Sequence, residues 1–138
     1  MHLVGIDPDL FKSGFAVWNK TNRELVEYGK LTFWELVEFI ENHRKDYKYI
    51  LEAGWLNKKS NWHLNELGKR SEKIAYRVGQ NHTIGMLIEE LFKKLGVDYQ
   101  LIKPRKSKLK KEEFAKITGI KARINQDIRD AIMLVYGF

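Results

Sequence analysis

A short apolar run that ends in a carboxylate constrains the fold of this chain more than any other feature. Leu3–Ile6 is apolar throughout, which is typical of a buried strand, and Asp7 follows directly at its end. Pro8 fixes its own φ and biases Asp7 toward extended geometry, so the chain should leave the strand through a turn. A second apolar run, Phe15–Trp18, begins directly after Gly14 and predicts the returning strand of a hairpin.

Asp7 at the end of this strand has two interpretations. Burying a carboxylate is unfavourable unless a cation or a hydrogen-bond donor compensates, so the position can mark a functional site. Alternatively, the side chain accepts hydrogen bonds from amides of the turn, as aspartates in turns often do. The first strand alone leaves both interpretations open.

The rest of the chain alternates between strand and helix patterns. Apolar runs predict strands over 2–7, 14–19, 24–31, 47–51 and 97–102. Thr32 and Glu35 have the spacing of a capping box, which predicts a helix that begins there and ends near residues 43–46. Further helices are expected over 71–95, over 110–117 and from Asn125 onward, with an irregular polar segment over 53–71.

Length and composition exclude several classes of protein. A chain of 138 residues fits one domain, 1–138, and 43% hydrophobic residues are enough for a real core. Because there is no cysteine, disulfides, thiolate zinc sites and cysteine nucleophiles are excluded. We find no signal segment and no apolar run of transmembrane length, so we expect a cytoplasmic protein without a membrane partner.

The positive charge of the chain is concentrated in one segment. Residues 101–123 contain nine bases and two acids, so this segment accounts for the whole net charge of +7. A run of charge is usually a solvated surface, but this concentration favours a polyanion as partner.

Two acids of the last predicted helix complete a set of four. Asp127 and Asp130 are three residues apart, so both lie on one flank of that helix. The helix dipole can explain Asp127 in the first turn, but it gives no reason for Asp130 beside it. With Asp7 and with Glu52, which follows the strand over 47–51, they form an all-oxygen set suited to Mg²⁺ or Mn²⁺. Two such ions can promote an in-line displacement at phosphorus.

The order of these motifs resembles that of the RuvC-type Holliday-junction resolvases, within the ribonuclease H-like superfamily. The resemblance covers nearly the whole chain and is carried by Gly5-Ile6-Asp7-Pro8 with Gly14, Ile50-Leu51-Glu52, Gly79-Gln80 and Asp127-Ile128-Arg129-Asp130-Ala131. It implies an α/β fold with a mixed five-stranded sheet, in which the first three strands are antiparallel, flanked by helices. It also implies a homodimer that nicks four-way DNA junctions in pairs, with two Mg²⁺ ions, or Mn²⁺ in their place, in each active site.

The resemblance assigns roles to individual residues. Asp7, Glu52, Asp127 and Asp130 match the metal-binding acids, and Lys108 matches a basic residue near the scissile phosphate. Trp55 falls where the family has an aromatic residue that enters the centre of the junction, and its alternative interpretation is a core residue that closes the end of the sheet. The expected DNA-binding residues are Trp55, Lys58, Lys59, Lys103, Arg105, Lys106, Lys108, Lys110 and Lys111. A compact form of this kind would act in the cytoplasm of a bacterium, or of an infected host cell if a phage encodes it.

Other functions remain open. A different ribonuclease H-like nuclease, acting on RNA–DNA hybrids, flaps or branched DNA, would use the same four acids. A non-catalytic junction-binding protein would need the basic segment but would gain nothing from four carboxylates. An actin-like ATPase needs two such domains, so we expect no nucleotide cofactor. Finally, Gly79 and Gly85 within the long helix predict close approach of a helix from a second copy, and the alternative is that they pack against this chain's own sheet.

Overall fold

The structure, a computed structural model, describes residues 1–57, 69–105 and 107–138. Its strands are β1 (His2–Asp7), β2 (Ser13–Asn19), β3 (Glu24–Leu31), β4 (Tyr47–Glu52) and β5 (Asp98–Ile102). Its α-helices are α1 (Phe33–Asn42), α2 (Lys69–Leu95), α3 (Lys111–Thr118) and α4 (Gln126–Val135), and a 3₁₀ turn covers Gly54–Leu56. Each predicted element is present, and its bounds differ by no more than a few residues from those that the sequence indicates.

The five strands form one mixed sheet in the order β3-β2-β1-β4-β5. β1 pairs antiparallel with β2, and β2 with β3, whereas β1, β4 and β5 are mutually parallel along the sheet. This confirms the expected α/β sheet with its three antiparallel strands at the start of the chain. Because β1 and β4 are parallel neighbours, their carboxyl ends, with Asp7 and Glu52, lie at the same edge of the sheet.

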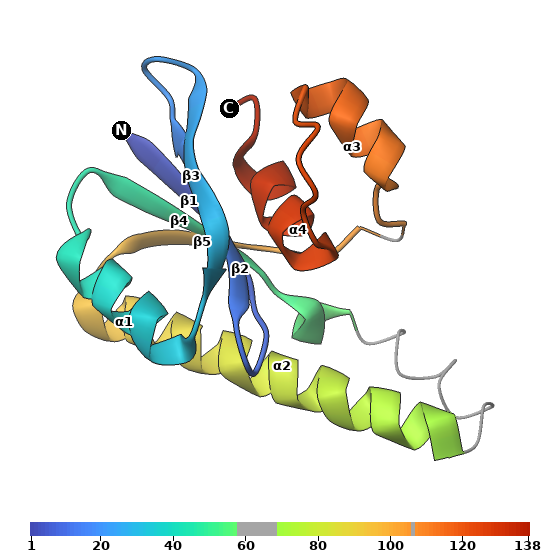
Figure 1. Cartoon of the computed structure of the whole chain (residues 1–138). Helices are drawn as coiled ribbons and strands as arrows, with labels where there is room; N and C mark the ends of the chain where they lie inside the picture. The colour runs from blue at the N-terminus through green and yellow to red at the C-terminus, as the bar shows by residue number, and fades with distance from the viewer. Residues whose placement is uncertain (58–68, 106) are drawn as a thin grey trace.

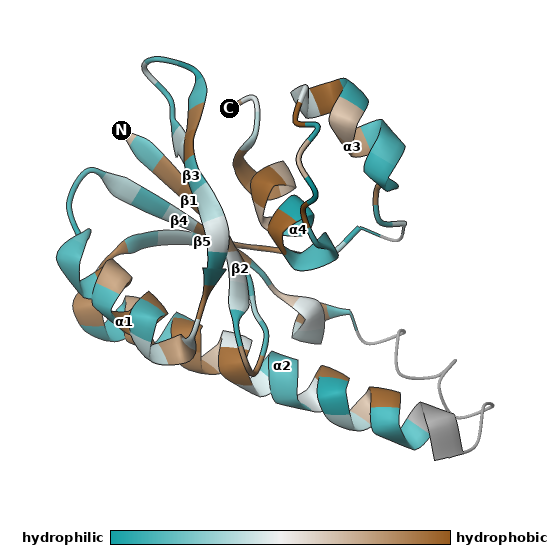
Figure 2. Cartoon of the chain, viewed as in Figure 1, coloured by the Kyte–Doolittle hydropathy of each residue, from teal (hydrophilic) through white to brown (hydrophobic). Residues whose placement is uncertain are grey.

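Helices cover both faces of the sheet and create two hydrophobic cores (Figure 1). α1 and α2 cover one face, where Val4, Ile6 and Leu51 contribute to the larger core. α4 covers the other face, over Leu3 and Ile50. In Figure 2, brown apolar stretches alternate with teal polar ones along the strands and helices, and apolar residues continue into the part of α2 that extends past the sheet.

The alternation of side chains along the strands determines which face receives the acids. Val4 and Ile6 point to the α1–α2 face, so Leu3, Gly5 and Asp7 point to the α4 face. By the same alternation, Glu52 follows Ile50 onto the α4 face. Both strand-end acids therefore project toward α4.

α4 lies so close to the sheet that two strand residues must be glycine. A Cβ atom at Gly5 would be 2.3 Å from the carbonyl oxygen of Ala131, and one at Gly14 would be 2.2 Å from that of Asp127. Backbone atoms cannot yield as a flexible side chain can, so no larger residue fits without moving the helix. The two glycines thus set the distance between α4 and the strands that carry Asp7.

Local signals in the sequence explain where the helices begin. The Oγ1 of Thr32 accepts a hydrogen bond from the Glu35 amide (3.2 Å), and the Glu35 carboxylate accepts one from the Thr32 amide (3.0 Å), which confirms the capping box. The Asn125 side chain accepts from the Ile128 amide (3.1 Å) and begins α4. Among the described residues, no helix is both long and apolar enough to span a membrane.

The packing of α4 predicts opposite effects for two glycine-to-alanine substitutions. Gly14→Ala should lower the free energy of unfolding by about 2 kcal/mol or more, since its methyl group would overlap the backbone of α4. Gly79→Ala should raise it by about 0.5–1 kcal/mol, because Gly79 is exposed in α2, with no neighbouring atom of the described chain within 4 Å of an added Cβ, and alanine is the better helix former. Urea unfolding of both variants measures the difference. Equal effects would contradict this account of α4.

Candidate functional site

Three acids from three elements converge at the carboxyl edge of the sheet. Carboxylate oxygens of Asp7, Glu52 and Asp130 all lie within 4.8 Å of one another. Asp7 ends β1, Glu52 ends β4, and Asp130 comes from α4, which the glycine contacts hold against the strands. The structure therefore brings together three of the four acids that the sequence singles out.

Two neighbours fix the orientation of the Asp130 carboxylate. Gln126, one turn earlier on α4, donates a hydrogen bond from Nε2 to Asp130 Oδ1 (2.7 Å). The Lys108 ammonium donates to the other oxygen, Oδ2, and forms an ion pair there. Arg129 in turn donates from Nη2 to Gln126 Oε1 (2.8 Å), which orients the amide so that its nitrogen faces Asp130. Gln126 is a positioning residue that the sequence analysis missed, although its spacing of four from Asp130 could have indicated it.

Burial and like charges make Asp7 and Glu52 hard to ionise in the absence of a cation. Desolvation and then the charge of Glu52 raise the pKa of Asp7 to about 8, with smaller contributions from Asp130 and Asp127, while Lys108 acts in the opposite direction. Desolvation also raises the pKa of Glu52, again partly offset by Lys108. The negative charge of the site is thus only partly neutralised by the neighbouring lysine, which is typical of a cation site.

Asp127 takes a different position from the other three acids. Its carboxylate forms an ion pair with Lys30 of β3, with 3.2 Å between Nζ and Oδ2. It lies outside the group of three, although its charge still contributes to the raised pKa values of Asp7 and Glu52. The sequence gives no signal for Lys30, because only the tertiary packing of α4 beside β3 brings the two residues together.

The basic segment passes this acidic cluster on its way from β5 to α3. Ala53, which follows Glu52, donates its amide to the Ile102 carbonyl (2.7 Å), so the segment starts beside the site. The described members of the predicted DNA-binding set within it are all exposed: Lys103, Arg105, Lys108, Lys110 and Lys111. The predicted DNA-binding residues Lys58, Lys59 and Lys106 lie outside the described residues.

Trp55 packs against α2 instead of projecting freely from the site. It lies in the 3₁₀ turn after Glu52, is half-buried and contacts the larger core. A Cβ atom added at Gly85 would be 2.3 Å from the Trp55 ring and 3.2 Å from Pro8, so this glycine makes room for the indole of its own chain. Gly85 therefore does not offer a surface for a second helix, which was one of the two interpretations of its place in the sequence.

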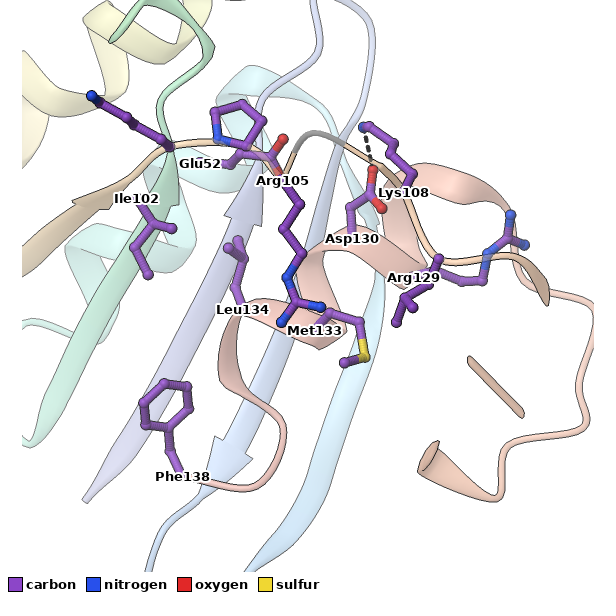
Figure 3. A pocket seen from close by; sticks show the side chains of 12 residues that line it. Glu52, Ile102, Arg105, Lys108, Arg129, Asp130, Met133, Leu134 and Phe138 are labelled. Atoms are coloured by element: carbon purple, nitrogen blue, oxygen red, sulfur yellow. Dashed lines mark hydrogen bonds and ion pairs between the residues drawn. The ribbon is translucent and has the colours of Figure 1, made fainter. Parts of the chain in front are cut away.

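A cleft of about 170 Å³ opens beside the acidic cluster (Figure 3). Glu52, Asp130 and Lys108 line one end of it. The remaining walls come from the end of β5, the basic segment, the outer side of α4 and the residues after it, and include Ile102, Arg105, Met133, Leu134 and Phe138. A ligand held by the acids would thus have an adjoining apolar space with a basic residue at its rim.

The chemistry of the cluster fits a hard divalent cation. Carboxylate oxygens are the donors that Mg²⁺ and Mn²⁺ prefer, and the cluster contains no nitrogen or sulfur ligand among its three members. Lys108 already places one positive charge at Asp130, and Lys30 places another at Asp127. The positions of these two ammonium groups show that positive charge is favourable beside both acids of α4.

No family model and no curated protein matches the sequence. Solved structures do match over 97% of the chain. Thermus thermophilus RuvC in complex with a Holliday junction substrate is 16% identical, with a TM-score of 0.59 over 89% of that chain. A further structure of Thermus thermophilus RuvC is 18% identical, with a TM-score of 0.57 over 90% of that chain. Fowlpox virus resolvase, in complex with substrate Holliday junction DNA, is 15% identical, with a TM-score of 0.50 over 93% of that chain. The chain therefore shares the fold of these solved structures, as the resemblance in the motifs implies.

Proposed function

We propose that this protein is a metal-dependent endonuclease that resolves four-way DNA junctions by paired nicking. The observation that carries the proposal is the convergence of Asp7, Glu52 and Asp130 at the edge of a RuvC-like sheet. The basic segment beside this cluster supplies the charge that a DNA backbone requires. Two of the similar structures contain a Holliday junction, which supports a branched DNA substrate.

The acids and Lys108 have separate tasks in this proposal. Asp7, Glu52 and Asp130 would hold one divalent ion, and Asp127 would contribute to a second. Two such ions, when bound, stabilise the attacking and leaving oxygens of a phosphodiester hydrolysis. Gln126 keeps the Asp130 carboxylate turned toward the cluster. Lys108, already paired with Asp130, places its ammonium where it can neutralise charge that develops on the phosphate.

A homodimer suits the paired nicking of a two-fold substrate. The exposed part of α2 carries apolar side chains, Ile74, Tyr76, Met86 and Leu87, that are 38–69% exposed. A second copy would bury them, and a two-fold dimer would present two acidic clusters to the junction. We place such a dimer in the cytoplasm of a bacterium or of an infected host cell. A native mass of one chain at micromolar concentration, with and without junction DNA, would count against the dimer.

Cleavage assays with Mg²⁺ test the proposed function. Wild-type protein should nick a synthetic four-way junction symmetrically and leave duplex, flap and RNA–DNA hybrid intact. Asp7→Asn should reduce nicking at least about a thousandfold, since it removes a ligand charge, yet bind the junction with similar affinity because phosphate contacts dominate binding. Asp98→Asn is the matched control, as Asp98 is exposed and begins β5 at the opposite edge. Degradation of the hybrid instead would favour the alternative ribonuclease H-like activity.

Stability should depend on pH and metal in a linked way. In EDTA, the folded state keeps a proton on Asp7 up to about pH 8, whereas the unfolded chain loses it near pH 3.8. Between these values the unfolded state binds fewer protons, so the free energy of unfolding falls as pH rises. Asp7→Asn should therefore melt at a higher temperature than wild type at pH 8 but not at pH 4.

Mg²⁺ at pH 8 should reverse this order. It binds the folded wild type and should raise its Tm, while Asp7→Asn should respond much less. Thermal melts in EDTA and in Mg²⁺, with Asp98→Asn as control, measure both effects. A wild-type Tm that is independent of pH and of Mg²⁺ would contradict a cation site at Asp7.

The basic segment should determine the salt dependence of DNA binding. Replacing both Lys110 and Lys111 by alanine should make log K less steep against log [salt], by roughly 0.9 for each duplex phosphate that the variant no longer neutralises. Replacing both Lys20 and Lys45 by alanine removes the same charge from exposed loops at the opposite edge of the sheet. This control should leave the slope of log K against log [salt] unchanged. If both variants alter the slope equally, the segment acts only through net charge.

A further inference from the structure

The cleft beside the acidic cluster has one polar end and one apolar end. Glu52 and Asp130 belong to both the cluster and the cleft, so the two spaces are continuous. Beyond them the walls become apolar, with Ile102 from β5, Met133 and Leu134 from α4, and Phe138. A ligand that enters from the acids therefore passes from a polar end into an apolar one.

The apolar end is built from positioned side chains. Trp18 donates its indole N–H to the Phe138 carbonyl (2.7 Å), which holds that residue beside the sheet, and leaves its side chain half exposed. Met133 and Leu134 are successive residues of α4, so their backbone positions are fixed by the helix that carries Asp130. Figure 3 shows the Arg105 side chain extending over this part of the cleft. The cleft thus has an apolar wall on one side and an exposed guanidinium on the other.

These features select the chemistry of the occupant. The polar end, with its carboxylates and the Lys108 ammonium, suits a phosphate with a divalent cation. The apolar end suits a flat ring, which can also stack on a guanidinium plane. A nucleotide joins these two groups at a fixed spacing. In an intact duplex its base is paired and stacked, but at a junction or in a single strand the base is free to turn into a cleft.

From this arrangement we propose that the cleft binds one unstacked nucleobase of the strand whose phosphate lies at the acidic cluster. The inference rests on the proposed function for the phosphate end, and it adds a second point of attachment next to the bond that is cut. A nucleotide whose base enters the cleft is anchored on both sides of its sugar. Cleavage would therefore favour DNA in which a base next to the scissile phosphate can leave its stack.

Methyl groups of methionine provide a direct test. The chain has three methionines, Met1, Met86 and Met133, of which only Met133 lines the cleft. In full-length protein labelled with ¹³C in the methionine methyl groups, the Met133 resonance, assigned with Met133→Leu, should shift upfield when a five-nucleotide oligothymidylate binds in the presence of Mg²⁺. The same oligonucleotide without bases should produce no such shift, and the Met86 resonance should stay in place with both.

Affinity measurements complete the test. Phe138→Ala should weaken binding of the base-bearing oligonucleotide by about tenfold and leave binding of the abasic one unchanged. Tyr28→Ala, which removes an exposed ring from β3 outside the cleft, is the matched control and should change neither. The proposal is overturned if the Met133 methyl responds equally to both oligonucleotides, or if DNA binds without moving it. Either result would leave the proposed nuclease function standing, provided that the wild type nicks junctions. Conversely, a base-dependent shift of the Met133 resonance without any nicking would overturn the nuclease function and support the proposal that the cleft binds a base.

Discussion

The contact between the backbone of α4 and the strands beneath it decides whether this chain has a site at all. Asp7 and Glu52 lie together at the edge of the sheet because their strands are parallel neighbours. Asp130 reaches them only because Gly5 and Gly14 let the helix lie against the sheet without intervening side chains. Gly5 and Gly14, which have no functional side chain, therefore determine the position of the Asp130 carboxylate.

The clustered carboxylates repel one another, and nearby lysines neutralise this negative charge only in part. Lys108 and Lys30 each neutralise one carboxylate on α4. Asp7 and Glu52 have no such partner among the described side chains, and the pKa values of both are raised by burial. Stability alone does not explain such an arrangement, since apolar residues would pack the same space without repulsion. The unfavourable burial of these carboxylates is explained if a divalent cation, with more charge than a lysine ammonium, binds there.

Most of the fold could be predicted because its signals are local. The capping box at Thr32 and the strand that ends in Asp7 depend on residues close together in the sequence, and both are present in the structure. The convergence of Asp7, Glu52 and Asp130 could also be anticipated, from the order of strands and helices. The pairing of Asp127 with Lys30 could not, because it depends on which flank of α4 faces β3.

Trp55 shows a second limit of sequence reasoning. Its place three residues after Glu52 allows either a ring that enters the DNA junction or a core residue that closes the end of the sheet, and in the structure the half-buried indole packs over Gly85. A glycine thirty residues away in the sequence thus decides the environment of this aromatic side chain. Only the three-dimensional packing of α2 reveals that pair.

The packing around Gly85 also connects α2 to the chain segments that follow two of the acids. Pro8, directly after Asp7, and Trp55, three residues after Glu52, both meet α2 at this glycine. Asn81, one turn earlier, accepts a hydrogen bond from the amide of Leu10 (3.0 Å) in the loop between β1 and β2. One rigid helix therefore touches the segments that follow two of the three acids, and its exposed end extends well beyond them (Figure 1). A tilt of α2 would therefore have to carry the segments after Asp7 and Glu52 with it or break these contacts.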